Sequence, residues 1–354
     1  MSLAGKGAVL VTGGAGYIGS HAAVALHEAG YDPVLLDNLA NSNIHAVEAV
    51  RALCQKEVPF FEVDCCDPQA VRGVFDAMKR RGTPLVGVIH FAAHKAVGES
   101  VEHPAMYAHN NVGSLGAVLQ VMAEFDVHGM VFSSSCTVYG EPDSPAVTED
   151  TPLQEAESPY GWTKQACERI LADHTRVDLR RRVALLRYFN PVGAHPSALL
   201  GELPLGTPNN LVPFLTQTVA EIRESLTVFG DDYDTNDGTC IRDYLHVMDL
   251  AEAHVKALDW CRESTHEGRC RAFNLGSGSG ASVMEVIQTF EAATGLKVPF
   301  RMGERRPGDV VAIWADPSRA LAELGWRTER SLQEAMADAW RWQTAQKSDN
   351  QTHA

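Results

Sequence analysis

The sequence predicts an α/β fold, in which a doubly wound parallel sheet is followed by a smaller mixed α/β region, and two observations support this. Short apolar runs rich in Val, Ile, Leu and Phe recur through the first 190 residues, and stretches with helical spacing separate them. Strands without polar alternation are typical of a parallel sheet that helices cover on both faces. The second observation is a change of composition near residue 190, which indicates a second region.

The expected strands follow one another with helices between them. They cover residues 8–11, 33–37, 60–64, 85–92, 129–135 and 183–189. Residues 21–30 and 67–81 have the spacing of amphipathic helices, so the order is that of repeated strand–helix–strand units. Crossovers in such a sheet are right-handed, which leaves a ligand-binding crevice at the carboxyl ends of the strands.

The second region begins with residues 190–210, which contain four prolines and three glycines where a regular crossover would be expected. It continues through an Asp-rich loop at 231–238, a mixed stretch at 241–258 and a final helix at 332–346. We therefore expect a first domain over 1–190 and a second over 191–354. The mixed stretch leaves room for a return of the chain to the first domain near 240–270.

Composition excludes several classes of function. The formal net charge of −15 argues against a nucleic-acid binder and against an anionic-membrane binder, since both need a basic surface. No run of about 18 apolar residues and no secretory signal is present, which predicts a soluble, cytoplasmic protein. The eight cysteines show no zinc-ligand spacing and two are adjacent, so we expect buried thiols and neither a disulfide framework nor a metal site.

The first chemical signal is VLVTGGAGYIGSH at 9–21, which follows an expected strand and opens an expected helix. Gly13, Gly16 and Gly19 allow the backbone to approach a pyrophosphate, whose charge then lies at the helix N-terminus. Asp37 ends the next apolar run, where a carboxylate can accept the hydroxyls of an adenosine ribose. No arginine follows in NLANSN to pair with a 2′-phosphate, so the motif favours NAD over NADP. The alternative is a tight turn that binds no ligand.

The second signal is SPYGWTK at 158–164. Ser158 can cap a helix and Pro159 suits its first position, which places Tyr160 and Lys164 on one helical face. For an arbitrary pair at this spacing, a core aromatic beside a surface lysine is the simpler interpretation. A lysine ammonium about 4 Å from the phenol, at an effective dielectric of about 20, would supply about 4 kcal/mol, which is the shift that a neutral-pH base needs. An oxidised nicotinamide ring would add more positive potential, so the pair can make a phenolate beside a nicotinamide. Ser135, at the end of another expected strand, can hydrogen-bond both the tyrosine and a substrate oxygen.

Together these motifs resemble the extended short-chain dehydrogenase/reductase family. Over about residues 8 to 345, further blocks resemble its UDP-glucose (UDP-galactose) 4-epimerase branch: LDNLANS, FAAHKAVGES, NNVGS, FSSSCTVYG, LLRYFNPVGAHPS, PNNLVPF, TVFGDDYDTNDGT, IRDYLHVMDLA and RRPGDV. The resemblance implies a Rossmann NAD-binding domain and a UDP-sugar-binding domain. It also implies an NAD-dependent isomerase of galactose metabolism that interconverts UDP-galactose and UDP-glucose through a 4-keto intermediate. A homodimer formed through paired helices of the NAD-binding domain is implied as well.

The resemblance also implies roles for single residues. The implied catalytic residues are Ser135, Tyr160 and Lys164. The implied NAD contacts are Gly13, Gly16, Tyr17, Ile18, Gly19, Asp37, Asn38, Leu39, Ala40, Asn41, Ser42, Asp64, Cys65, Phe91, Ala92, Lys95, Asn110, Ser135, Tyr160, Lys164 and Phe189. The implied UDP-sugar contacts are Lys95, Ser135, Tyr160, Asn190, Asn210, Leu211, Thr227, Val228, Phe229, Arg242, Tyr244, Arg306 to Asp309, and Ile313. Guanidinium groups at two of these positions suit a diphosphate, because they present a fork of donors.

A few positions depart from the family pattern. Ala93 and His94 stand where Gly and Leu are common, and Trp162 stands where Lys is common. We expect His94 to be a satisfied polar neighbour and Trp162 to lie at the surface or at an oligomer contact. Ile313 occupies the position that lines the pocket near the sugar's 2-substituent. Because isoleucine is intermediate in size, UDP-glucose and UDP-galactose are the expected substrates, and UDP-N-acetylhexosamines stay open.

Two alternatives remain. A sugar-nucleotide 4,6-dehydratase, or another sugar-nucleotide epimerase of the extended family, has the same fold and the same tyrosine–lysine pair. The dehydratases, however, resemble Thr-Asp-Glu where this chain has Ser135, Cys136 and Thr137, so an acid for the expulsion of water has no evident source. A non-catalytic NAD sensor is the alternative from a different class, but it needs neither the catalytic residues nor the UDP-sugar blocks.

Overall fold

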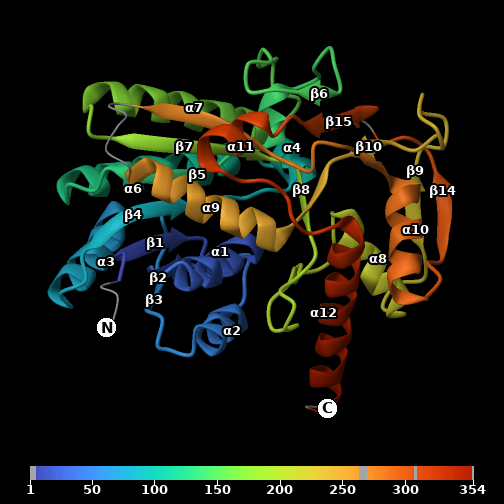
Figure 1. Cartoon of the computed structure of the whole chain (residues 1–354), viewed down its shortest axis with the longest axis horizontal. Coiled ribbons are helices and arrows are strands. Elements are labelled where there is room, and N and C mark those ends of the chain that lie inside the picture. The colour runs from blue at the N-terminus through green and yellow to red at the C-terminus, as the bar shows by residue number, and fades with distance from the viewer. Residues whose placement is uncertain (1–4, 263–268, 307–308, 353–354) are drawn as a thin grey trace.

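The computed structural model describes residues 5–262, 269–306 and 309–352 (Figure 1). Within these ranges, a seven-stranded sheet has the strand order β3-β2-β1-β4-β5-β7-β12, and every pair of neighbours is parallel. All the expected apolar runs form strands of this sheet. The predicted fold, a doubly wound parallel sheet with a smaller second region, is therefore confirmed.

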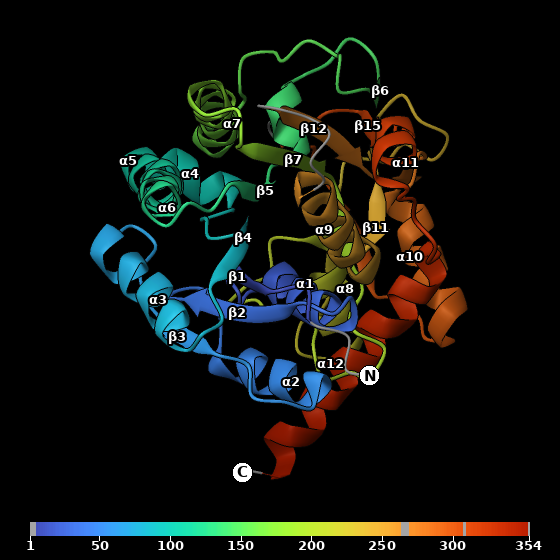
Figure 2. The ribbon, with the colours of Figure 1, turned by 60° about the vertical axis from the view of Figure 1, so that its left-hand side comes forward.

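Helices cover both faces of the sheet (Figure 2). The strands are β1 (Ala8–Thr12), β2 (Asp32–Asp37), β3 (Phe60–Glu62), β4 (Leu85–His90), β5 (Gly129–Ser133), β7 (Arg182–Tyr188) and β12 (Cys270–Leu275). One face packs against α1 (Tyr17–Glu28), α2 (Ile44–Cys54), α9 (Val247–Arg262) and α11 (Ser318–Leu324). The other packs against α3 (Pro68–Arg80), α6 (Gly113–Glu124) and α7 (Pro159–Val177). Two short helices, α4 (Val97–Glu102) and α5 (Pro104–Tyr107), and a π-helical turn (Ala108–Val112) lead into α6.

Strand β1 shows why the apolar runs lack polar alternation. Its side chains alternate between the two faces of the sheet, and both faces are covered. Val9 and Val11 join the core cluster that contains α1 and α9, whereas Ala8 and Leu10 join the cluster that contains α3, α6 and α7. All of β1 is buried, so every position along it selects an apolar or hydrogen-bonded side chain.

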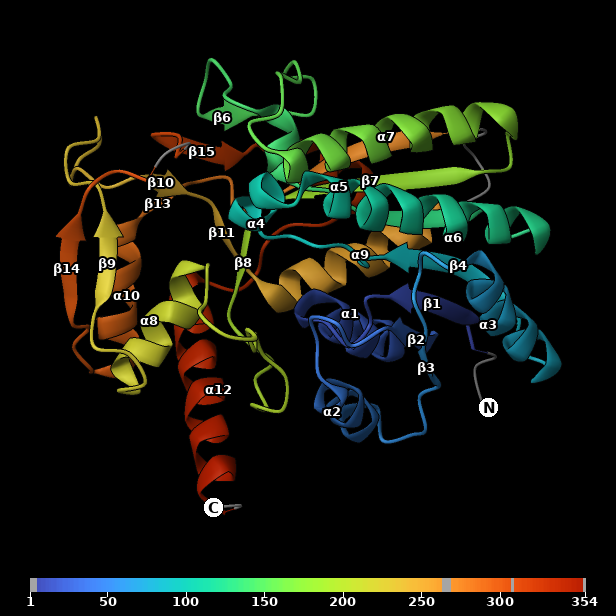
Figure 3. The same cartoon turned by 180° about the vertical axis from the view of Figure 1, so that it is seen from behind.

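The second region has a core of its own (Figure 3). It contains α8 (Leu211–Val219), α10 (Val283–Thr294), α12 (Leu332–Thr352) and the parallel pair of β9 (Leu226–Phe229) with β14 (Phe300–Gly303). Between the two regions, β8 (Asn190–Val192) pairs with β11 (Tyr244–His246). A small sheet there has the order β13 (Ala281–Ser282), β10 (Ile241–Arg242), β15 (Ala312–Ala315) and β6 (Ala146–Val147).

The chain crosses between the regions more than once. It returns to the large sheet for α9 and β12, where β12 becomes the neighbour of β7. In the opposite direction, β6 leaves the first region and pairs with β15. No helix in the described part of the chain is long and apolar enough to cross a membrane.

Candidate active site

The carboxyl ends of the strands bring together the residues expected to bind the cofactor. Asp37 ends β2, Phe91 follows β4, Ser135 lies just after β5 and Phe189 follows β7. The strand order reverses at β1, because β2 and β3 lie on one side of it and β4 lies on the other. Open parallel sheets bind ligands at such a reversal, and the glycine-rich turn after β1 lies there.

The conformation of this turn explains its glycines. Gly13 has a φ of +67°, and a Cβ on it would stand 2.9 Å from the backbone nitrogen of Ala92. A Cβ on Gly19 would overlap the carbonyl group of Gly13. Gly16 is the N-cap of α1 and has no side chain, so it leaves the first-turn N–H groups of the helix for another acceptor. These donors and the positive end of the helix dipole fit a pyrophosphate.

Asp37 connects this turn with the loop after β2. Its Oδ2 accepts a hydrogen bond from the N–H of Ala15 at 3.0 Å. Its Oδ1 accepts from the N–H of Leu39 at 2.9 Å and from the hydroxyl of Ser42 at 2.8 Å. A carboxylate has about four acceptor positions, so one stays available for a ribose hydroxyl. The rest of this loop includes three exposed residues from the expected set, Asn38, Ala40 and Asn41.

Four other expected cofactor contacts lie near the same edge of the sheet. Asp64 lies just after β3, and its Oδ1 accepts from the N–H of Cys66 at 2.8 Å. Cys65 is buried beside it. The thiol of Cys66 donates to the carbonyl oxygen of Asn110 at 3.6 Å, so the end of β3 touches the π-helical turn. At the start of α1, the hydroxyl of Tyr17 donates to a carbonyl group of the second region.

Helix α7 carries the tyrosine–lysine pair, and its start follows the prediction from the sequence. The Oγ of Ser158 accepts a hydrogen bond from the N–H of Gly161 at 3.1 Å, and the helix begins at Pro159. Lys164 is only 3% exposed, and its Nζ donates to the carbonyl oxygen of Ser133 at 2.7 Å. The same Nζ lies 5.7 Å from the centre of the Tyr160 ring. The ammonium group is therefore held between β5 and the tyrosine, not at the surface.

Burial dominates the ionisation of this pair. It raises the pKa of the Tyr160 phenol above its usual value, and Tyr188 adds to the shift, whereas the hydrogen bond with Ser135 opposes it. Burial also lowers the pKa of Lys164 to about 8. Removal of water disfavours the charged form of both groups, so burial shifts the pKa of the phenol in the direction opposite to the shift expected from a neighbouring ammonium group.

Sequence reasoning missed Glu168, which lies one helical turn beyond Lys164. Its Oε1 accepts from the hydroxyl of Ser134 at 2.6 Å. The guanidinium group of Arg187 binds both of its oxygens, at 2.9 and 2.6 Å, and both side chains are buried. This network holds the end of β5, just before Ser135, against α7. The positions 160, 164 and 168 share one helical face, and that spacing was the available signal.

Strand pairing brings together four of the expected UDP-sugar contacts. Asn190 of β8 is the register partner of Tyr244 on β11. Arg242 of β10 is the register partner of Ile313 on β15. Ile313 is 5% exposed and packs in one cluster with Phe189, so this position lies at the boundary with the cofactor side.

Three charged residues expected to contact the UDP-sugar lie in the second region. The Nη2 of Arg242 donates to the Oδ1 of Asp309 at 3.2 Å, and both side chains keep some contact with water. The guanidinium group of Arg306 lies 4.6 Å from the ring centre of Phe229. Residues 307 and 308, between them, lie outside the described residues. Two guanidinium forks at one edge suit a diphosphate.

Two expected substrate contacts point elsewhere. Val228 is 1% exposed and belongs to the core of the second region, so its side chain packs in that core and does not face a ligand. Leu211 packs against the same core. Lys95 and Asn210, in contrast, meet at the carboxylate of Glu202, a residue for which the sequence offered no signal.

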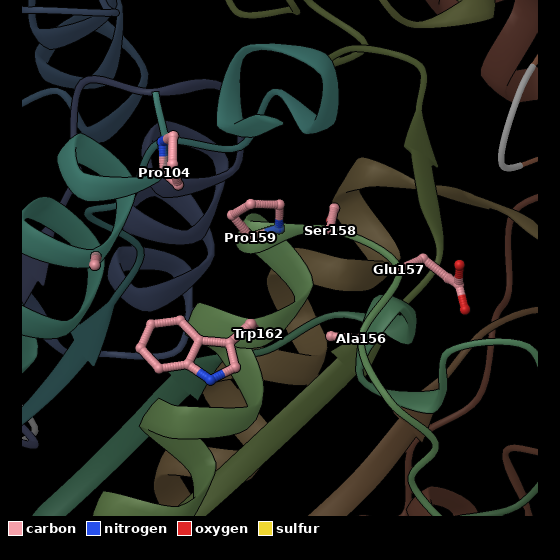
Figure 4. Close-up of a pocket in the computed structure, with 7 residues that line it drawn as sticks. Pro104, Ala156, Glu157, Ser158, Pro159 and Trp162 are labelled. Atoms are coloured by element: carbon pink, nitrogen blue, oxygen red, sulfur yellow. The ribbon is translucent and has the colours of Figure 1, made fainter. Parts of the chain in front are cut away.

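The start of α7 also lines a pocket of about 490 Å³ (Figure 4). Its lining includes Pro104, Pro159 and Trp162, and the indole is 52% exposed. Trp162 therefore lies at the surface, as expected. His94 lies near the site, where its backbone N–H donates to the side-chain oxygen of Asn111 at 2.8 Å.

Taken together, these features are those of an extended short-chain dehydrogenase/reductase. A family model described as GDP-mannose 4,6 dehydratase matches residues 10–339. Two curated relatives, the UDP-glucose 4-epimerases of Bacillus subtilis and Schizosaccharomyces pombe, are each 50% identical. The alignments cover 96% of this chain in both cases, and 97% and 94% of the two relatives. The chain belongs to the UDP-glucose 4-epimerase family.

Solved structures agree with this membership. A UDP-glucose 4-epimerase from Stenotrophomonas maltophila, with bound NAD and formylated UDP-arabinopyranose, has a TM-score of 0.92 and 45% identity. It aligns over 97% of this chain and 99% of its own. The enzyme from Bifidobacterium longum, in complex with NAD+ and UDP, has a TM-score of 0.90 and 43% identity, over 96% and 99% of the two chains.

Proposed function

We propose that this protein is an NAD-dependent UDP-glucose 4-epimerase, an isomerase that interconverts UDP-galactose and UDP-glucose. The observation that carries the proposal is the position of the half-buried Tyr160 and the buried Lys164. They lie at the same edge of the sheet as the glycine-rich turn, beside the strands that carry Asn190 and Arg242. Membership of the UDP-glucose 4-epimerase family supports the same function.

The cofactor side of the site fits NAD. The uncapped N–H groups at the start of α1 suit its pyrophosphate, and Asp37 suits the ribose of its adenosine half. When bound, NAD supplies an acceptor and then a donor of hydride for carbon 4 of the hexose. The contribution of the chain is to position that carbon, to move its hydroxyl proton and to exclude water.

Tyr160 is the group that takes the proton of the hexose 4-hydroxyl and returns it. Ser135 hydrogen-bonds the phenol, and this bond opposes the rise of the phenol's pKa. The same bond orients the phenolic oxygen. The cation of Lys164 favours the phenolate, and the positive charge of an oxidised nicotinamide adds to it. Arg242 and Arg306 anchor the diphosphate, so the 4-keto sugar can turn about its bond to the diphosphate and present its opposite face.

A 4,6-dehydratase would need an acid near carbon 6 of the sugar. At the end of β5, the dehydratase acid pair is replaced in this chain by Cys136 and Thr137. Burial raises the pKa of the Cys136 thiol to about 11, which makes it a weak acid. The site therefore favours epimerisation over the expulsion of water.

The same proposal includes a homodimer formed through helices of the NAD-binding domain. Trp162 and Ile170 are exposed apolar residues on α7, which a second copy of the chain would cover. Sedimentation equilibrium measures this directly, and a monomer at working concentrations would contradict it.

The function is tested by incubation of the pure protein with UDP-galactose without added NAD, and NMR resolves the products. We expect a mixture of UDP-galactose and UDP-glucose, because the cofactor is regenerated in each turnover. A second incubation with UDP-N-acetylglucosamine tests the tolerance set by Ile313. Unchanged UDP-galactose after incubation with folded, NAD-loaded protein would contradict the proposed function.

A further inference from the structure

The segment between β8 and α8 is fixed from two sides where it passes between the regions. The hydroxyl of Tyr17, on α1, donates to the carbonyl oxygen of Gly193 at 2.7 Å. The indole Nε1 of Trp342, on α12, donates to the carbonyl oxygen of Glu202 at 3.0 Å. Gly201 lies flat against that indole, and a Cβ on it would overlap the ring. Helix α12 therefore holds the backbone of Glu202, and α1 holds the start of the same segment.

The side chain of Glu202 joins two residues of the candidate site. Its Oε1 accepts from the Nδ2 of Asn210 at 2.8 Å and from the Nζ of Lys95 at 3.2 Å. Asn210 is the N-cap of α8 in the second region, and Lys95 lies in the loop after β4. The Glu202 side chain is 13% exposed, whereas that of Lys95 is 54% exposed. A largely buried carboxylate thus anchors a long, exposed lysine side chain.

We propose that Glu202 is a positioning residue for the nucleotide sugar, which holds Lys95 of one region and Asn210 of the other at a fixed separation. This inference rests on the proposed function, in which these two residues contact the cofactor and the UDP-sugar. A free lysine side chain has many rotamers, and a ligand that must order it binds more weakly. With the ammonium group held in advance, less freedom is lost when a diphosphate binds.

Simple electrostatics predicts the opposite sign, which makes the inference testable. A carboxylate near a diphosphate repels it, so removal of a passive negative charge should tighten binding. Removal of a positioning carboxylate should weaken binding, because Lys95 and Asn210 both lose their anchor. The direction of the change therefore separates the two roles.

The experiment measures the dissociation constant of UDP and the KM and kcat for UDP-galactose with NAD-loaded protein. For Glu202→Ala we expect the dissociation constant and KM to rise about tenfold, with kcat changed less than about threefold. Glu202→Gln should keep most of the affinity, because an amide oxygen can still accept from both partners. In the Lys95→Met background, Glu202→Ala should weaken UDP binding less than about threefold, because the two residues act as a unit.

A matched control is Glu291→Ala on α10. Glu291 also pairs with a lysine, Lys297, at 2.6 Å and accepts from the backbone N–H of Val298. This control should leave UDP binding unchanged. Tighter UDP binding by Glu202→Ala, or the same fold loss with and without Lys95, would overturn the inference. A wild-type protein that binds UDP but fails to interconvert the two sugars would instead contradict the proposed function.

Discussion

The cofactor side and the substrate side of the site hold their charges differently. Lys164 is buried at the end of β5, and burial lowers its pKa to about 8. Arg242 and Asp309 keep 16% and 26% of their side chains in contact with water. On the cofactor side, the removal of water shifts the pKa of Lys164. On the substrate side, Arg242 and Asp309 form an ion pair that stays partly hydrated, as suits the proposed binding of a diphosphate. The two proposed tasks, proton transfer and anion binding, thus go with different degrees of hydration.

The largest expected effect is that of a substitution at Tyr160, on the cofactor side. The phenol is the proposed proton carrier, and Tyr160→Phe removes its hydroxyl but keeps the ring. We expect turnover of UDP-galactose to fall at least about a hundredfold, the scale of a lost general base. Bound NAD should stay at the wild-type level, measured from the nucleotide released on denaturation. Near-normal turnover by a pure sample would remove Tyr160 from this role.

On the substrate side, we expect a substitution to change the affinity for the UDP-sugar and to leave the rate of the chemical step nearly unchanged. Arg242→Gln removes the guanidinium fork that pairs with Asp309 and is proposed to bind the diphosphate. KM for UDP-galactose should rise about ten- to hundredfold, in keeping with about 1.5–3 kcal/mol for a charge-assisted hydrogen bond. The kcat should change much less, as steady-state kinetics would show.

The matched control for this prediction is Arg72→Gln. Arg72 also binds a carboxylate through two nitrogens, that of Glu124, but it lies on α3 away from the site. KM should stay at the wild-type value in this variant. A loss in kcat equal to the loss in kcat/KM for Arg242→Gln would place Arg242 in the chemical step instead.

The smallest expected effect is on the free energy of unfolding, and it concerns a buried histidine on the cofactor side. His254 on α9 is fully buried, and burial lowers its pKa to about 4. An unfolded histidine titrates near 6.5, so between these values only the unfolded chain binds the proton. The stability contributed by the neutral ring is fully present above about pH 6.5. It then falls by about 1.4 kcal/mol for each unit below that value.

His254→Phe removes this titration, and the ring can pack beside Phe91, whose ring centre lies 4.6 Å from that of His254. From pH 7.5 to 5.5, the free energy of unfolding should decrease by about 1.4 kcal/mol less in the variant than in the wild type. Urea denaturation at both pH values measures this difference. An equal decrease in both proteins would show that His254 does not titrate on unfolding.

Local sequence patterns predicted the frame of the molecule well. The strands of the large sheet, the Ser158 cap of α7 and the turn at Gly13 follow from apolar periodicity, capping chemistry and backbone sterics, which all act over a few residues. The place of β12 beside β7 could not be predicted in this way, because it depends on contacts between distant parts of the chain. Glu202 escaped notice for the same reason, since its partner Lys95 is far from it in sequence.

Spacing could not give the burial of one pair. The four-residue separation of Tyr160 and Lys164 correctly placed both side chains on one helical face, but it carried no information on burial. In the structure Lys164 is buried and Tyr160 is partly buried, and desolvation is the largest cause of the pKa shift of each group. The direction in which a phenol's pKa moves beside a lysine therefore depends on the solvent exposure of both groups, which helical spacing does not contain.

The central claim is that the half-buried Tyr160 becomes a base through positive charge from Lys164 and the oxidised cofactor. It is tested most directly by pH titration of the phenol absorbance, as the difference between wild type and Tyr160→Phe. The protein is loaded first with NAD and then with its reduced form. We expect the Tyr160 pKa to lie below about 10 with oxidised NAD, to be at least about one unit higher with the reduced cofactor, and to rise in Lys164→Met. A phenol that stays protonated above about pH 10 in an active, NAD-loaded protein would contradict the account.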